Sequence, residues 1–307
     1  MIRLLTACLV LGLGQATLQA QDTRDERHYP AGDWNWTFLE RHPAAGRLFN
    51  AFDYGHAVLY ERLLTHDASS VTAALDAEYR FLVDDLLARP PRFAVAEEAI
   101  APAYSKLAWP AKQFFDRAHV LHRQIYDVYA RTELGRPAQD ALIEALVDHY
   151  LAETAYAFTD RPKAMALMDE QPFSQRFRRE HPVFNGLIWA YHWLQVGLYE
   201  PLLVATTPAE QEVGVRRTLD RFRAMISHPD SMPRVMPMTA DVSPRFAAAH
   251  PRAAAIFDNL HMMHDIISDI LVQPEWTRAE KRAEILRQMA EMRDGTRNLM
   301  EGGMHRH

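Results

Sequence analysis

The chain has 307 residues, of which 48% are hydrophobic and 24% are charged. This is the composition of a globular protein with enough apolar residues for a buried core. The formal net charge is −6, and acidic and basic residues are interspersed along the chain. Because no stripe of basic residues is present, the sequence argues against a nucleic-acid-binding protein.

Residues 1–20 have the pattern of a secretory signal peptide. Arg3 precedes an apolar stretch from residue 4 to residue 13, and small residues that suit cleavage end at Ala20. The stretch is too short to span a bilayer, and no later segment is apolar for long enough, so we expect no transmembrane segment. Residues 5–8 look like a lipoprotein box, but the apolar run continues past Cys8, which disfavours lipidation. The sequence therefore predicts a soluble protein that is exported and becomes periplasmic or extracellular after cleavage.

Cys8 is the single cysteine of the chain, so removal of the signal peptide would leave none. A mature chain without cysteine has no disulfide, thiolate-ligated zinc, iron–sulfur cluster, covalent c-type haem or blue-copper site. Any metal ion must then be held by histidine, carboxylate, methionine or water.

Residues 21–307 predict a single all-α domain. Glycine is scarce, with 12 residues, and no segment alternates strictly between apolar and polar residues. Thr207 and Thr277 each begin a helix-capping pattern, and prolines separate the helical segments. We expect a bundle of about eight long helices, at 44–65, 70–88, 111–132, 138–157, 183–204, 208–226, 252–272 and 277–297. Shorter helices are expected at 34–40, 97–107, 162–168 and 244–249.

One helical unit occurs four times in the sequence. Gap-free alignments pair residues 42–61 with 181–200, 115–127 with 257–269, and 42–61 with 250–269. The shared residues include His-Pro at the start of three units and aligned aspartate and histidine residues further along. The pattern predicts internal duplication, with two homologous halves at about 34–160 and 172–300.

Each unit carries a column of three positions spaced i, i+3 and i+6, which lie on one face of a helix. The columns are Asn50, Asp53 and His56; Asp116, His119 and His122; Trp189, His192 and Gln195; and Asp258, His261 and His264. Four-helix di-iron proteins use similar inward Glu-x-x-His pairs. If the four helices face one another, the columns converge on one interior. The predicted metal ligands are His56, His119, His122, His192, His261 and His264, with Asp53, Asp116 and Asp258 as ligands or as partners that orient the imidazoles.

Three functions fit this pattern. We expect a metalloprotein with a dinuclear centre that performs redox or oxygen chemistry, because burying so many titratable groups without a cation would be costly. Iron or copper fits best, and zinc or manganese is an alternative, the zinc case allowing a hydrolytic reaction. The second function is non-catalytic metal storage, delivery or sensing. The third is a helical scaffold whose histidines and aspartates form a polar core. The expected partner is a metal or another small ligand.

Three further sets of residues recur among the units. The acids Glu61, Asp127, Glu200 and Asp269 fit second-tier ligands, inter-helix pairs or solvated charges. The histidines that precede proline, His42, His181 and His250, are better explained by the geometry of a helix start than by metal ligation. The tyrosines Tyr60, Tyr126 and Tyr199 fit core positions, or hydrogen bonds to the metal site.

Overall fold

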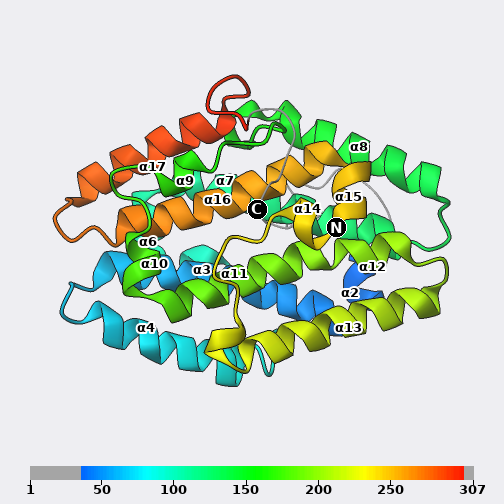
Figure 1. The fold of residues 1–307 in the computed structure, drawn as a ribbon, viewed down its shortest axis with the longest axis horizontal. Coiled ribbons are helices and arrows are strands. Elements are labelled where there is room, and N and C mark those ends of the chain that lie inside the picture. The colour runs from blue at the N-terminus through cyan, green and yellow to red at the C-terminus, as the bar shows by residue number, and fades with distance from the viewer. Residues whose placement is uncertain (1–35, 301–307) are drawn as a thin grey trace, which may run out of the picture.

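The protein is a bundle of helices, seen in a computed structural model that describes residues 36–300 (Figure 1). Within this range the only β-structure is one isolated bridge between Lys163 and Leu299. The all-α prediction is therefore confirmed. None of the helices within residues 36–300 is long and apolar enough to cross a membrane. The predicted signal peptide and Cys8 lie outside the described residues.

The long helices and their extensions account for all eight of the predicted long segments. They are α3 (Pro43–Thr65), α4 (Val71–Arg80) with a π-helical continuation (Phe81–Leu86), α7 (Trp109–Ala130), α8 (Arg136–Ala152), α11 (Pro182–Gly197), α13 (Pro208–Ile226), α16 (Pro251–Leu271) and α17 (Arg278–Arg293). The shorter helices are α2 (Thr37–Arg41), α5 (Glu97–Ile100), α6 (Pro102–Leu107), α9 (Ala166–Asp169), α10 (Arg176–Glu180), α12 (Tyr199–Val204), α14 (Thr239–Val242) and α15 (Pro244–Ala249). Short 3₁₀ turns lie at Thr154–Tyr156 and Pro229–Ser231.

Two predicted helices are interrupted, and two short helices were not predicted. The expected helix 183–204 divides at Leu198 into α11 and α12, because Pro201 has no N–H with which to continue the helical hydrogen bonds. The expected helix 97–107 divides before Pro102 for the same reason. Helices α10 and α14 have only five and four residues, too few for a visible apolar period.

Four long helices are each preceded by a short helix, and the joint between them has the same shape every time. The pairs are α2 with α3, α6 with α7, α10 with α11, and α15 with α16. The joint residues His42, Ala108, His181 and His250 have φ between −132° and −127° and ψ between 43° and 64°. A proline follows within two residues and starts the long helix, as expected for a residue whose missing N–H has no intrahelical partner there.

Acidic side chains cap two of the short helices across the bundle. Asp127 of α7 accepts backbone N–H groups at the start of α2 at 3.0 and 2.8 Å. Asp269 of α16 accepts the equivalent groups at the start of α10 at 2.6 and 2.8 Å. The residues at these starts, Trp36 and Gln175, both have positive φ, at 71° and 65°. The two carboxylates therefore satisfy N–H groups that a helix start leaves free.

The other two acids of this set act in the same way. Glu61 of α3 accepts the backbone N–H groups of Ala103 and Tyr104 at the start of α6. Glu200 of α12 accepts the N–H of Arg245 at the start of α15, at 3.1 Å. Each acid thus accepts hydrogen bonds from the start of another helix. Internal duplication remains a prediction. A duplicated chain would be expected to repeat this contact between an acid and the start of a short helix, which occurs four times here.

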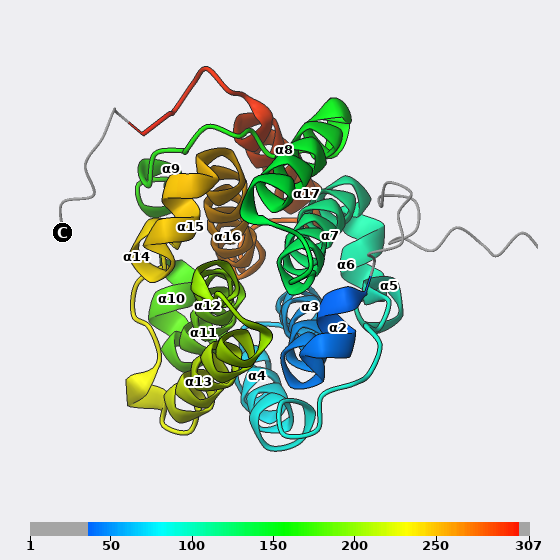
Figure 2. The same cartoon turned by 90° about the vertical axis from the view of Figure 1, so that its right-hand side faces the viewer.

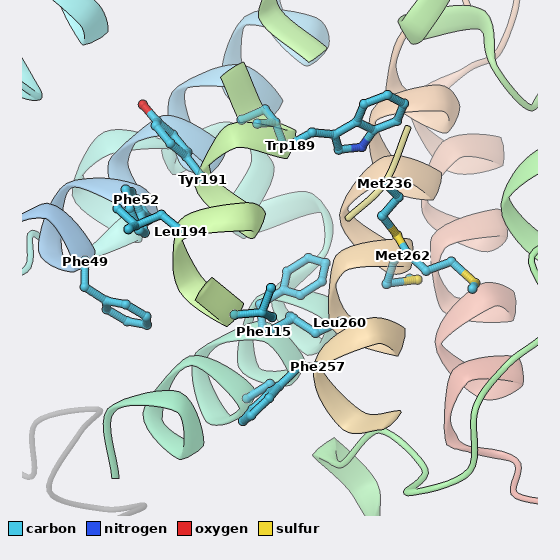
Figure 3. Close-up of a cluster of buried hydrophobic side chains, with 14 of the residues drawn as sticks. Phe49, Phe52, Phe115, Trp189, Tyr191, Leu194, Met236, Phe257, Leu260 and Met262 are labelled. Atoms are coloured by element: carbon cyan, nitrogen blue, oxygen red, sulfur yellow. The ribbon is translucent and has the colours of Figure 1, made fainter. Parts of the chain in front are cut away.

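The four helices α3, α7, α11 and α16 surround the centre of the bundle, and α4, α8, α13 and α17 lie outside them (Figure 2). Figure 3 shows side chains from the inner helices, among them Phe52, Phe115 and Leu260, directed into the interior. Gly55 allows α3 and α11 to approach closely, because a Cβ atom there would lie 2.5 Å from the ring of Tyr191. This contact places the neighbouring His56 opposite His192.

Candidate metal centre

The six histidines of the columns lie together at the centre of the bundle, and each is at most 2% exposed. Their rings form a continuous group. Those of His56 and His264 stack with centroids 4.0 Å apart, and those of His192 and His261 at 4.1 Å. The ring centroids of His119 and His264 are 5.4 Å apart, and those of His122 and His261 are 5.8 Å apart. The inner helices therefore bring all six predicted histidines into one interior.

Three of these histidines, from three different helices, form a compact group that we call the histidine triad: His56 of α3, His192 of α11 and His264 of α16. The Nε2 atom of His192 lies 3.1 Å from Nε2 of His56 and 3.1 Å from Nδ1 of His264. One atom from each residue lies within 4.8 Å of the other two. Imidazole nitrogens on one metal ion, each at about 2.0–2.1 Å, are about 2.9–3.4 Å apart, so the two distances from His192 suit a shared ion.

The protons of the triad cannot satisfy all of these nitrogen contacts. The Nδ1 atom of His56 lies 3.0 Å from the carbonyl oxygen of Phe52. A carbonyl only accepts, so Nδ1 of His56 carries the proton and its Nε2 has a lone pair. That lone pair faces Nε2 of His192, which also faces Nδ1 of His264 and has at most one proton for the two contacts. A cation among the three nitrogens would remove this conflict.

Burial keeps the imidazoles neutral, which is the form that binds a metal. Desolvation, followed by repulsion from His119, lowers the pKa of His56 to about 3. Desolvation also lowers the pKa of the other four affected imidazoles well below the usual value, with neighbouring histidines adding to the effect: His122, His192, His261 and His264. The lone pairs therefore remain available at neutral pH.

A second group of three possible ligands lies beside the first and consists of Asp53, Glu97 and His119. The Oδ1 atom of Asp53 lies 3.1 Å from Nδ1 of His119, and its Oδ2 lies 3.7 Å from the guanidinium of Arg123. Lys112, which is 1% exposed, adds a buried positive charge beside this group and forms ion pairs with Glu98 at 3.0 Å and with Asp116 at 2.7 Å. The group could hold a metal ion, although cationic side chains already lie beside its carboxylates.

Glu97 was not among the predicted ligands. It is 5% exposed and begins the four-residue helix α5, which has no counterpart among the repeated columns. No spacing in the sequence links it to Asp53 or His119, so only the folded arrangement reveals it.

Asp116 and Asp258 are in neither group of possible ligands. Asp116 forms an ion pair with Lys112 at 2.7 Å. Asp258 accepts the backbone N–H and the hydroxyl of Thr239, both at 2.8 Å, at the start of α14. Both residues occupy the first position of a column, about 9 Å along the helix from the third position, since a helix rises about 1.5 Å per residue. The two aspartates lie on the predicted face of their helices, but too far along the helix axis to reach the same site as the third-position histidines.

The first column position of the remaining units is also used for packing. The side-chain amide of Asn50 donates to the carbonyl oxygen atoms of Pro91 and Arg92 at 3.3 and 2.7 Å. The ring of Trp189 packs under the guanidinium of Arg178. The second and third positions of the four columns therefore form the centre, and the first positions contact other residues around it.

One of the three recurring tyrosines contacts an imidazole directly. The hydroxyl of Tyr199 lies 2.6 Å from Nδ1 of His122. Tyr60 donates to the backbone carbonyl of His264 at 3.2 Å, and Tyr126 donates to the backbone carbonyl of Gln195. All three side chains hold the centre in place, and Tyr199 alone does so through a histidine ring.

No protein-family model, no curated protein and no solved structure matches this chain. The function is therefore argued from the geometry and chemistry of the centre.

Proposed function

We propose that the protein binds a transition-metal ion in the centre of the bundle through Nε2 of His56, Nε2 of His192 and Nδ1 of His264. The observation that carries the proposal is that Nε2 of His192 contacts one buried imidazole nitrogen from each of two other helices, at 3.1 Å in both cases. A purely structural polar core would pair such atoms with donors and acceptors, because unpaired buried polar groups destabilise a fold. In the triad, the nitrogen atoms that face one another have too few N–H protons to form all of their hydrogen bonds.

The ligand set supports copper, iron or zinc. The triad provides three imidazoles and no carboxylate, and imidazole suits these metals, whereas manganese prefers oxygen ligands. Asp53 and Glu97 lie close to His119, beside the triad, and would supply negative charge near the ion without binding it.

We propose redox or dioxygen chemistry as the activity. The six histidines are at most 2% exposed, so only electrons or molecules as small as dioxygen can reach the ion without opening the bundle. Copper or iron would supply one-electron oxidation and reduction there. Hydrolysis of a large substrate by metal-bound water fits such a buried position poorly.

We further propose that the protein is exported, on the pattern of residues 1–20. Cell fractionation followed by mass spectrometry of the intact protein tests this. The proposal expects a periplasmic or secreted chain that begins at residue 21. A cytoplasmic chain that retains residues 1–20 would contradict it.

The metal is tested by elemental analysis of the full mature chain, purified without a histidine tag and reconstituted with copper, iron or zinc. The variant is His192→Ala, because His192 contacts both other triad members. The matched control is His149→Ala, which removes an exposed histidine. We expect bound metal in the wild type and in the control, and at least a tenfold loss of affinity in the folded His192→Ala variant. A wild type that binds no metal, or a variant that binds it equally well, would overturn the proposal.

A further inference from the structure

A second set of polar side chains at the centre lies outside the triad. It consists of His122 of α7, His261 of α16 and Gln195 of α11, which are all 0% exposed. Within the described residues, no hydrogen-bond partner exists for Nε2 of His122, for either ring nitrogen of His261, or for the side-chain amide oxygen and nitrogen of Gln195. Buried polar atoms without partners cost about 1–3 kcal/mol each and are rare in native proteins. So many in one place point to a site that binds a ligand.

The two imidazoles are spaced as if they shared an ion. The ring centroids of His122 and His261 are 5.8 Å apart, and the ring planes differ by 19°. Two imidazoles bound to one ion at about 2.0–2.1 Å have centroids about 5–6 Å apart. One face of each ring is covered, since His122 stacks on Phe257 at 3.6 Å and His261 stacks on His192 at 4.1 Å. The nitrogen atoms lie on the ring edges, where a metal ion binds.

Hydrogen bonds show which nitrogen of His122 is left for a ligand. Tyr126 donates its hydroxyl proton to the backbone carbonyl oxygen of Gln195, which can only accept. The hydroxyl of Tyr199 lies 2.6 Å from Nδ1 of His122, so this nitrogen already has a partner. Nε2 of His122 has none among the described residues and is the ring atom that faces a ligand.

These two hydrogen bonds hold two of the three residues of the set in place. Tyr199 holds the ring of His122, and Tyr126 holds the backbone of Gln195, the residue at the matching position of the α11 column. Such hydrogen bonds behind the ligands are typical of metal sites, where they fix the tautomer and orientation of the imidazole. Tyr199 is therefore a positioning residue.

We propose a second metal position, held by Nε2 of His122, a ring nitrogen of His261 and the amide oxygen of Gln195. The ligand is a divalent first-row transition-metal ion, which accepts imidazole together with a neutral oxygen. This inference rests on the proposed function and deepens it, because the stacked rings of His192 and His261 place the second position beside the triad. The second position has one imidazole fewer than the triad, so it fills after the triad.

The test is a titration of the metal-free, tag-free full chain with Co²⁺, followed by its visible absorption and by elemental analysis. We expect two equivalents for the wild type, in two steps of different affinity. His122→Ala and Gln195→Leu should each lose the weaker step and keep the tighter one. His56→Ala should weaken the tighter step. Gln195→Leu is nearly equal in volume and removes two unpartnered polar atoms, so it is the variant that keeps the fold.

Tyr199→Phe separates positioning from packing, because it removes only the hydroxyl. We expect a loss of about 10–100-fold in the affinity of the weaker step and a changed absorption spectrum of that step, with the tighter step intact. A wild type that binds one equivalent, unchanged by His122→Ala and Gln195→Leu, would overturn the second position and leave the proposed function standing. A wild type that binds none would overturn the proposed function itself. Loss of both equivalents in folded Gln195→Leu would contradict two separate positions.

Discussion

His56 and His192 face each other across the bundle with their Nε2 atoms 3.1 Å apart, and Nδ1 of His56 faces the carbonyl oxygen of Phe52. The proton of His56 is thereby directed away from His192. Nε2 of His192 can donate its one proton to His56 or to His264, so the three imidazoles do not fully satisfy one another, but they are well placed to bind one cation. The predictions below separate this account from a polar core that serves stability alone.

Replacing His261 by leucine should stabilise the metal-free protein. Both ring nitrogens of His261 are buried and without a partner in the described part of the chain, and leucine has a similar volume. Removing them should raise the free energy of unfolding by about 1–3 kcal/mol, measured by urea denaturation in the presence of a chelator. A polar core predicts the opposite sign, so a clear destabilisation would count against a metal centre.

Bound metal should raise the melting temperature of the wild type. The triad joins α3, α11 and α16, and an ion that binds only the folded state stabilises it by about 2.7 kcal/mol when its free concentration is 100 times the dissociation constant. Calorimetry with and without a chelator measures the shift. The triple variant His56→Ala, His192→Ala, His264→Ala is the matched control and should show no shift. An equal shift in that variant would mean that the ion binds elsewhere.

Replacing Asp269 by alanine should lower the stability of the protein and leave its metal content unchanged. Its carboxylate accepts two backbone N–H groups at the start of α10, so Asp269→Ala leaves both without this partner. We expect a loss of about 1–3 kcal/mol in the free energy of unfolding, by chemical denaturation, with the metal stoichiometry of the wild type. Loss of metal from the folded variant would instead support the ligand interpretation of this acid.

Asp127 should make the protein less stable as the pH rises from about 4 to about 7. Burial, partly offset by the backbone N–H groups of Phe38 and Trp36, raises the pKa of Asp127 to about 7. The unfolded value is about 3.9, so between these two pH values the folded state retains a proton that the unfolded state has released. The stabilisation is therefore complete below pH 4 and is lost as the pH passes 7.

The comparison for this pH effect is Asp127→Asn, which cannot ionise. Unfolding free energies of both proteins, measured from pH 4.5 to pH 7.5, give the contribution of the carboxyl group as their difference. The wild type should lose stability relative to the variant across this range. A relative gain would show that the charged carboxylate is the favoured form in the folded protein.

The sequence predicts those parts of the fold that depend on local signals. Helix α13 runs over Pro208–Ile226, the predicted range, because Thr207 caps it and Pro208 starts it. Helix α17 begins at Arg278 behind the predicted capping box of Thr277 and Glu280. The periodic apolar residues and prolines mark most of the other long helices, with shifts of a few residues at their ends.

The candidate site is only partly predictable, because spacing along a helix gives the face and not the partner. The i, i+3, i+6 columns identify the histidines, since a shared face is a local property. The carboxylates of Asp116 and Asp258 are on the same face but contact Lys112 and Thr239. Glu97 reaches the centre from a short helix outside the repeats. Such contacts depend on tertiary packing, which no local pattern encodes.

The most direct test of the central claim is an anomalous difference map from crystals of the tag-free protein loaded with copper, iron or zinc, recorded at the absorption edge of that metal. The account predicts a peak between the Nε2 atoms of His56 and His192 and the Nδ1 atom of His264. Peaks confined to surface residues, or to the carboxylates of Asp53 and Glu97, would contradict it.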